Sequence, residues 1–167
     1  DRAKQFNKNL AFYTCCYLQV HTPDGSPCGL LNHLTLSVKV ATHQSVSSAI
    51  PQLLIDLGMC PLENSQMILE LGKPLYHVLL NGKVLGYVLK KDSRQLADKL
   101  RMIIVSTTDS RVPELTEICL IPEKNRGQFP GLFIFTGAAR MLRPVFDLAA
   151  KTVEYIGTLE QVYMDIA

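Results

Sequence analysis

The sequence predicts an α+β fold in which a mostly antiparallel sheet carries two short helices at its sides. Short runs of apolar and β-branched residues outnumber the segments with helical periodicity. Most of these runs are separated by brief turns rich in Gly, Pro and Asn, which is typical of strands that pair with their neighbours in the chain. The length of 167 residues allows one domain with a real core, or two small lobes.

The first part of the chain is expected to hold two strands joined by a stiff loop. Residues 11–20, AFYTCCYLQV, are rich in aromatic and β-branched side chains, and residues 34–42, LTLSVKVAT, alternate apolar with polar side chains. The stretch between them, HTPDGSPCGLLNHL, contains two turn sequences. Pro23 presets φ for a turn and Gly25 tolerates positive φ, so the chain is expected to reverse tightly. Taken locally, this loop is a connector between strands.

Two helices are predicted from capping residues and apolar periodicity. The first covers about residues 48–57, with serines as caps, Pro51 in its first turn and Gly58 as its stop. The second follows Asp92 as its cap and ends near Val105, with apolar side chains on one face.

A hairpin is predicted between these helices. Asn81 and Gly82 separate two apolar runs, residues 76–80 and 83–89, and this pair of turn residues favours a tight antiparallel hairpin. The remaining apolar segments, LTEICLIPE, GLFIFTGAARMLRPVFDL and KTVEYIG, are expected to form three or four strands, and residues 159–166 a short helix or an irregular strand.

Composition and charge narrow the class of protein. A hydrophobic fraction of 47% with 19% charged residues is typical of a folded chain, and a net charge of +2 gives no strong electrostatic attraction for nucleic acid. The five cysteines contain no C-x-x-C spacing, so we expect buried free thiols in a reducing compartment. Because the sequence shows neither a signal peptide nor an apolar run of membrane-spanning length, an intracellular, soluble protein is expected.

Residues for catalysis or metal binding are scarce. The sequence has no phosphate-binding glycine loop, no nucleophile elbow and no aspartate cluster for Mg²⁺, and its four histidines are scattered. We therefore assign no catalytic residue and no metal ligand. Arg140 and Arg143 are three residues apart and can be interpreted in two ways. They clamp a phosphate, or they pair with acids such as Glu154 or Glu160.

Several motifs resemble one protein family. The stretch VHTPDGSPCGLLNHL, followed by NGKVLG, FPGLFIFTGAARMLRPV and YIGTLEQVYMDIA, resembles the second-largest subunit of multisubunit DNA-directed RNA polymerases. Within that family the segments FPGLFIFTGAARMLRP and IGTLEQVYM are most similar to the RNA polymerase I form. The resemblance covers residues 20–167.

The resemblance gives the stiff loop a function. In the family this loop belongs to the fork region beside the active centre, where downstream DNA meets the RNA–DNA hybrid. The residues that match the family motif, and are implied to lie near nucleic acid or nucleotide, are His21, Thr22, Pro23, Asp24, Gly25 and Ser26. A rigid turn suits a wall beside a nucleic-acid path, because such a wall must keep its shape. Asp24 would place a carboxylate near the incoming nucleotide.

The resemblance also implies a division of the chain. Residues 1–20 are an atypical N-terminal segment ending in a strand, because NKNLAFYTCCYLQV replaces the family's usual Trp-Gly-Phe-x-Cys-Pro stretch. Residues 21–45 are the fork-like loop and strand, residues 46–128 an α+β external-type region, and residues 129–167 a β-rich external-type region that is incomplete at its C-terminal end. The chain is thus expected to be a fragment of a larger multidomain subunit.

Activity and partners follow from the resemblance as expectations. The complete enzyme is a nucleotidyltransferase that makes ribosomal RNA in the nucleolus of the nucleus, with Mg²⁺ bound mainly by the largest subunit. The chain itself needs no cofactor and is expected to be inactive alone. Its partners would be the largest subunit, the other RNA polymerase I subunits, DNA and the RNA–DNA hybrid, and no membrane. The alternative is a free-standing or degenerate interaction domain without polymerase activity.

Overall fold

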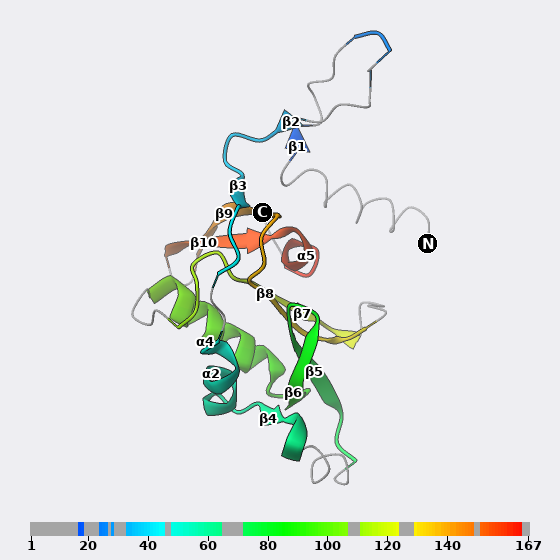
Figure 1. Ribbon diagram of the computed structural model, residues 1–167, viewed down its shortest axis with the longest axis vertical. Coiled ribbons are helices and arrows are strands. Elements are labelled where there is room, and N and C mark those ends of the chain that lie inside the picture. Colours follow the sequence, from blue (N-terminus) through cyan, green and yellow to red (C-terminus); the bar gives the residue numbers. More distant parts are fainter. Residues whose placement is uncertain are drawn as a thin grey trace. The chain divides into compact units, whose positions relative to one another are not determined.

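The computed structural model divides the chain into two compact units (Figure 1). Unit 1 comprises Asp1–Thr42 with Ala139–Ala167, and unit 2 comprises His43–Ala138. The fork-like and external-type regions expected at residues 21–45, 46–128 and 129–167 stay a prediction. The structure describes residues 17–18, 24–26, 28, 33–45, 48–64, 72–106, 111–123, 129–148 and 151–164.

Unit 2 is built on a five-stranded sheet in the order β4-β6-β5-β8-β7. Every neighbouring pair in this sheet is antiparallel except β5 and β8, which are parallel. The predicted α+β class with mostly antiparallel strands is therefore confirmed. The elements are β4 (Cys60–Pro61), the 3₁₀ turn η1 (Leu62–Asn64), β5 (Leu75–Leu80), β6 (Lys83–Leu89), β7 (Glu117–Ile121) and β8 (Gly131–Phe135).

The hairpin between β5 and β6 confirms the prediction made from Asn81 and Gly82. Leu80 pairs with Lys83, so the two residues between them form the whole turn. Their φ angles are 50° and 85°, and positive φ at both central residues is what a type I′ turn requires. Asparagine and glycine are the residues that adopt this backbone at least cost.

Helix α2 (Ile50–Asp56) starts differently from the prediction. Pro51 lies in the first turn as expected, but the N-cap residue is Ala49, with no side-chain capping bond, so the predicted serine cap is wrong. Pro51 has no amide, so a cap at Ser48 would lose one of the two backbone donors that an N-cap side chain uses, and only the amide of Ile50 would remain.

The end of α2 confirms Gly58 as the stop. Gly58 has φ of 109°, and its amide donates to the carbonyl of Ile55 at 3.0 Å. The amide of Met59 donates to the carbonyl of Leu54 at 2.9 Å. Together these two bonds form a Schellman motif, which satisfies carbonyls at the helix end and needs a residue that tolerates positive φ.

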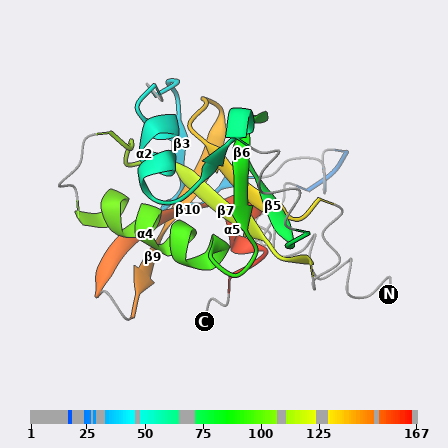
Figure 2. The same cartoon turned by 90° about the horizontal axis from the view of Figure 1, so that it is seen from below.

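Helix α4 (Ser93–Ser106) begins directly after Asp92, and Figures 1 and 2 show α2 and α4 on one side of the sheet. The alternating burial along β5 sends Tyr76, Val78 and Leu80 toward this side. The core of unit 2 is formed by side chains from both layers: Ile50, Leu53, Leu54, Met59, Tyr76, Val78, Leu80, Val88, Leu96, Ala97, Leu100, Val112, Ile118, Leu132 and Ile134.

Unit 1 contains a three-stranded antiparallel sheet in the order β10-β9-β3, and the separate antiparallel pair β1–β2. The most deeply buried residues of the larger sheet are Ala41, Leu142 and Ile156. Of the two alternatives for residues 159–166, a short helix or an irregular strand, the described residues show a short helix, α5. The elements are β1 (Tyr17–Leu18), β2 (His33–Leu34), β3 (Lys39–Ala41), β9 (Arg140–Asp147), β10 (Thr152–Gly157) and α5 (Thr158–Gln161).

The continuous strand predicted over residues 34–42 is wrong. Strand β2 ends at Leu34 and β3 begins at Lys39, and between them the amide of Val38 donates to the carbonyl of Thr35 at 3.2 Å in a turn. Leu36 is 104% exposed, so the apolar alternation does not mark a buried face. Because these apolar side chains do not pack on a core, their alternation does not require one uninterrupted strand.

Candidate nucleic-acid interface

The loop that resembles the polymerase fork connects β1 and β2. Tyr17 pairs with Leu34 and Leu18 with His33, so the two ends of the loop are held together by an antiparallel ladder. This position agrees with the local interpretation of a connector between strands. It also fixes the distance between the loop ends, which limits the shapes the loop can take.

Within this loop the structure describes Asp24, Gly25, Ser26 and Cys28, all exposed. Gly25 has φ of 92°, which confirms the predicted positive-φ position, and its carbonyl accepts a hydrogen bond from the amide of Cys28 at 3.1 Å. A side chain at this φ would be strained, so glycine is required for the turn. The predicted site residues His21, Thr22 and Pro23 lie outside the described residues.

The chemistry available on this turn is that of one exposed carboxylate beside a hydroxyl. Asp24 can accept hydrogen bonds and attract cationic groups, and Ser26 can donate or accept. Neither group is paired with a general base or a nucleophile in the described part of the loop. The turn can therefore orient a ligand, and its described residues provide no constellation for bond making.

Arg140 and Arg143 lie on β9, and the structure separates their side chains. Residues three apart in a strand point to opposite faces of the sheet, so the two guanidinium groups do not converge on one ligand. The Nε of Arg143 donates to Oε1 of Gln161 in α5 at 2.8 Å. Phosphate binding by Arg140 or Arg143 stays a prediction, and each arginine would bind a phosphate without the other.

Arg140 shares its face of the sheet with a different cation and an aromatic ring. Arg140 pairs with Ala41, Lys39 pairs with Leu142, and Tyr155 pairs with Pro144, positions that all lie on one face. The Nζ of Lys39 lies 3.8 Å from the centre of the Tyr155 ring. The sequence analysis missed Lys39 and Tyr155, because they are brought together only by the pairing of β3 and β10 with β9.

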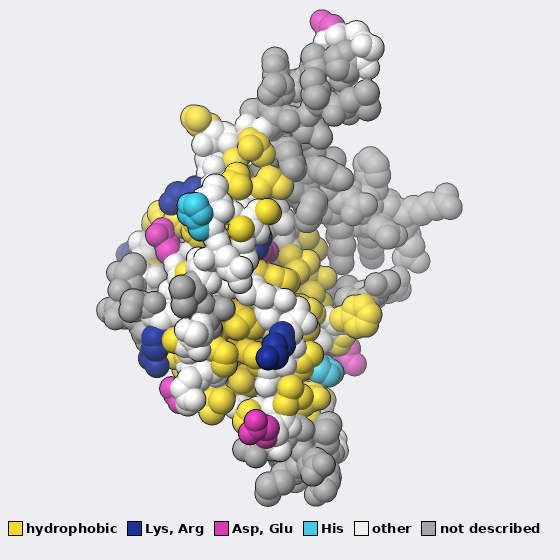
Figure 3. All heavy atoms as spheres, in the orientation of Figure 1, with side chains coloured by type: hydrophobic (Ala, Val, Ile, Leu, Met, Phe, Trp, Pro, Cys, Tyr) yellow, Lys and Arg dark blue, Asp and Glu magenta, His cyan; other side chains and the backbone are white. Residues whose placement is uncertain are grey.

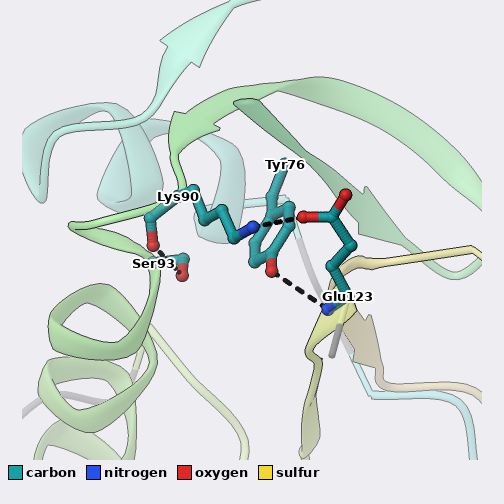
Figure 4. Close-up of polar contacts among 4 residues, drawn as sticks. All are labelled: Tyr76, Lys90, Ser93 and Glu123. Carbon is teal, nitrogen blue, oxygen red and sulfur yellow. Dashed lines mark hydrogen bonds and ion pairs between the residues drawn. The ribbon is translucent and has the colours of Figure 1, made fainter. Parts of the chain in front are cut away.

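A polar cluster in unit 2 joins the end of β6 to the residues after β7 (Figure 4). Lys90 forms an ion pair with Glu123, and the amide of Glu123 donates to the hydroxyl of Tyr76 at 3.1 Å. The hydroxyl of Ser93 donates to the carbonyl of Lys90 at 2.8 Å, at the start of α4. Each group has a partner inside the cluster, so this arrangement holds elements together rather than offering a reactive group.

The ion pair shifts the pKa values of both its members. The hydrogen bond from Lys90 holds the pKa of the Glu123 carboxyl below its ordinary value, and the same bond raises the pKa of the Lys90 ammonium. Both shifts favour the charged forms, as expected for opposite charges in contact. Because the side chains remain 35% and 63% exposed, solvent weakens their attraction.

Charge and metal ligands are sparse over the described residues. Figure 3 shows Lys and Arg side chains scattered, not gathered, on the face that it presents. No three His, Cys, Asp or Glu residues gather into a metal-binding group in the described part of the chain, so these residues do not fit a Mg²⁺ site. Among the same residues, no helix has the length and apolar character to cross a membrane.

Comparison with known proteins identifies the class. Residues 85–143 match the family described as RNA polymerase I, Rpa2 specific domain, and residues 8–40 match RNA polymerase Rpb2, domain 3. The chain is 51% identical over 150 residues to the DNA-directed RNA polymerase I subunit RPA2 of Drosophila melanogaster. It is 43% identical over 148 residues to subunit RPA135 of Saccharomyces cerevisiae, and 42% identical over 149 residues to RPA2 of Homo sapiens.

These matches cover 89% of this chain and 12–13% of each relative. Such identity over most of the chain, in proteins from fly, yeast and human, reaches well beyond a shared motif. The chain is thus part of a multisubunit DNA-directed RNA polymerase subunit family. Within that class it belongs to the RNA polymerase I form of the second-largest subunit, which confirms the resemblance seen in the sequence.

Proposed function

We propose that this chain is a section of the second-largest subunit of RNA polymerase I and supplies scaffold and active-centre wall for DNA-templated synthesis of ribosomal RNA. The observation that carries the proposal is the 51% identity to an RNA polymerase I subunit over 89% of the chain. The match of residues 8–40 to a polymerase domain includes the fork-like loop. The chain works in the nucleus, within the nucleolus, as one part of an assembled enzyme.

In this role the loop is a rigid boundary beside nucleic acid. The ladder between β1 and β2 and the positive-φ turn at Gly25 support a fixed shape. Asp24, exposed on that turn, orients basic neighbours and the incoming nucleotide through its charge. DNA, the RNA–DNA hybrid, the largest subunit and the other RNA polymerase I subunits are the partners.

Catalysis belongs to the assembly. Mg²⁺ held mainly by the largest subunit supplies the nucleotidyl-transfer chemistry when bound. The isolated chain should be inactive in template-dependent RNA synthesis, because its sequence has no aspartate cluster for Mg²⁺. Incorporation of nucleotides by the purified chain, surviving repurification and a tag control, would contradict this statement.

Two substitutions in the complete subunit test the role of the loop. Asp24→Asn keeps the size and turn-forming capacity of the side chain but removes its charge, so assembly with the largest subunit should be unchanged while single-round elongation slows. Gly25→Val strains the turn and should reduce assembly. An assembled Asp24→Asn enzyme with normal elongation would remove the active-centre role. Failure of the unaltered subunit to copurify with the largest subunit would favour a free-standing interaction domain.

A further inference from the structure

A shallow groove of about 670 Å³ lies in unit 2 along the exposed face of α4. Its apolar wall is formed by Leu57, at the end of α2, with Met102 and Ile103 of α4. Leu57 and Ile103 pack against the core, whereas Met102 is 56% exposed. A large apolar side chain left in water beside two half-buried ones forms a strip that a ligand can cover with gain of free energy.

Cations line the same groove. Lys91 lies just before α4, and Arg94 and Lys99 lie on the helix, all three exposed. No ion pair or hydrogen bond joins them to any residue that the structure describes. Their charges are therefore available to a ligand.

The groove is lined by one acid, Asp98, against the three cations. Asp98 lies 3.9 Å from Arg101, three residues along the helix. Arg94, Asp98 and Met102 follow one another at four-residue intervals, and Lys99 and Ile103 form the neighbouring row. The helix therefore presents an apolar strip bordered by an excess of positive charge, over a length of about 14 Å from Arg94 to Ile103.

We propose that this groove binds an acidic segment of a partner protein, one that places two or three carboxylates on the cations and a large apolar side chain against Met102. Charge complementarity selects the carboxylates, and the apolar wall selects the side chain between them. The inference rests on unit 2 alone and does not depend on the polymerase role.

Two other occupants fit less well. A nucleic-acid backbone would pair with the cations but would leave the apolar wall unused and bring phosphates close to Asp98. A second copy of this chain in a symmetric contact would set Lys91, Arg94 and Lys99 against the same cations of its twin, which is unfavourable.

The direct test is a titration of the full 167-residue chain with a fluorescein-labelled peptide of about twelve glutamate and leucine residues, followed by fluorescence anisotropy. Replacing the glutamates of the peptide with glutamine, or its leucines with serine, should weaken binding about tenfold or more. Equal binding of either altered peptide overturns the proposal. So does the absence of any binding by the original peptide.

Variants of the chain locate the binding site. The double change Arg94→Glu with Lys99→Glu should weaken binding about tenfold or more and create affinity for a lysine–leucine peptide, and Met102→Ser should weaken it about threefold. The matched control is Lys73→Glu with Lys83→Glu, which alters two exposed lysines of unit 2 outside the groove by the same charge. An equal loss in the control overturns the proposal.

Folding and nucleic acid are checked in the same experiment. If circular dichroism shows that the double glutamate variant melts early, Arg94→Gln with Lys99→Gln removes the charge with less repulsion and should still weaken binding several-fold. Unchanged binding by this milder variant contradicts the groove. A single-stranded DNA of similar length serves as the competing ligand. If it binds more tightly than the peptide, and the same variants abolish its binding, the ligand of the groove is nucleic acid and the proposal is overturned.

Discussion

Asn81 and Thr136 are joined by two hydrogen bonds across 55 positions of the chain. The Nδ2 of Asn81 donates to Oγ1 of Thr136 at 2.8 Å, and the backbone amide of Thr136 donates to Oδ1 of Asn81 at 2.8 Å. The amide of Asn81 also donates to the carbonyl of Ile134 at 2.8 Å. Asn81 is therefore part of the β5–β6 turn, and its side chain and backbone amide bond this turn to the end of β8.

Asn81→Ala is expected to lower the free energy of unfolding by about 1–3 kcal/mol, because it leaves the fully buried Thr136 without two partners. Urea denaturation of the full chain measures the change. Asn81→Gly is the control, since it also removes both bonds but relieves the positive φ of 50°. Equal stability of wild type and both variants would show that the two bonds contribute nothing.

The turn residue Gly82 allows the cost of backbone strain to be measured alone. An added Cβ would meet nothing within 4 Å, so Gly82→Ala should destabilise by about 1 kcal/mol through its φ of 85° and not through a clash. Gly137→Ala is the matched control, because its Cβ also meets nothing and its φ is not in the left-handed region. That change should stay within about 0.5 kcal/mol in the same urea titration. Equal effects of the two changes would contradict the type I′ turn.

The sequence predicted elements well where a local rule decides the structure. The Asn81–Gly82 turn and the Gly58 stop were both recognised because positive φ selects a few residue types. Local rules fail at residues 34–42, where apolar alternation predicts one strand although Leu36 contacts no core. Local rules also could not predict the parallel pairing of β5 with β8, because it joins segments about fifty residues apart.

Local sequence rules also predicted only part of the candidate site. The turn at Gly25 was predictable from its own residues, whereas the spacing of Arg140 and Arg143 suggested convergence that a strand does not allow. Lys39 and Tyr155 share a face with Arg140, although they lie 116 residues apart in the sequence. Such groupings depend on strand pairing, which no single segment specifies.

Close backbone approach predicts the effect of two further glycine substitutions. A Cβ on Gly86 would lie 2.1 Å from the carbonyl oxygen of Cys60 in β4, and one on Gly131 would lie 2.9 Å from that of His77 in β5. We expect Gly86→Ala to cost about 2 kcal/mol or more and Gly131→Ala to cost less. Hydrogen exchange should accelerate at the β4–β6 ladder in the first variant only. A larger loss of stability in Gly131→Ala than in Gly86→Ala would contradict the close approach of β4 to β6.

The ion pair between Lys90 and Glu123 makes stability depend on pH at both ends of the range. Because the pKa of Glu123 is lowered, its contribution is present above its ordinary value of 4.5 and is lost as pH falls through the lowered pKa. Because the pKa of Lys90 is raised, its contribution is present below its ordinary value of 10.5 and is lost as pH rises through the raised pKa.

Glu123→Gln should therefore lower the urea midpoint near neutral pH and make no difference at a pH well below the lowered pKa of Glu123, where the native carboxyl is itself protonated. Glu63→Gln on η1 is the control, because no ion pair joins that exposed carboxylate to another described residue, and it should change little at either pH. Both variants are compared with wild type in parallel urea titrations at the two pH values. A deficit of Glu123→Gln that persists unchanged in acid would mean that Glu123 stabilises the fold through packing or its amide bond to Tyr76, and not through its charge.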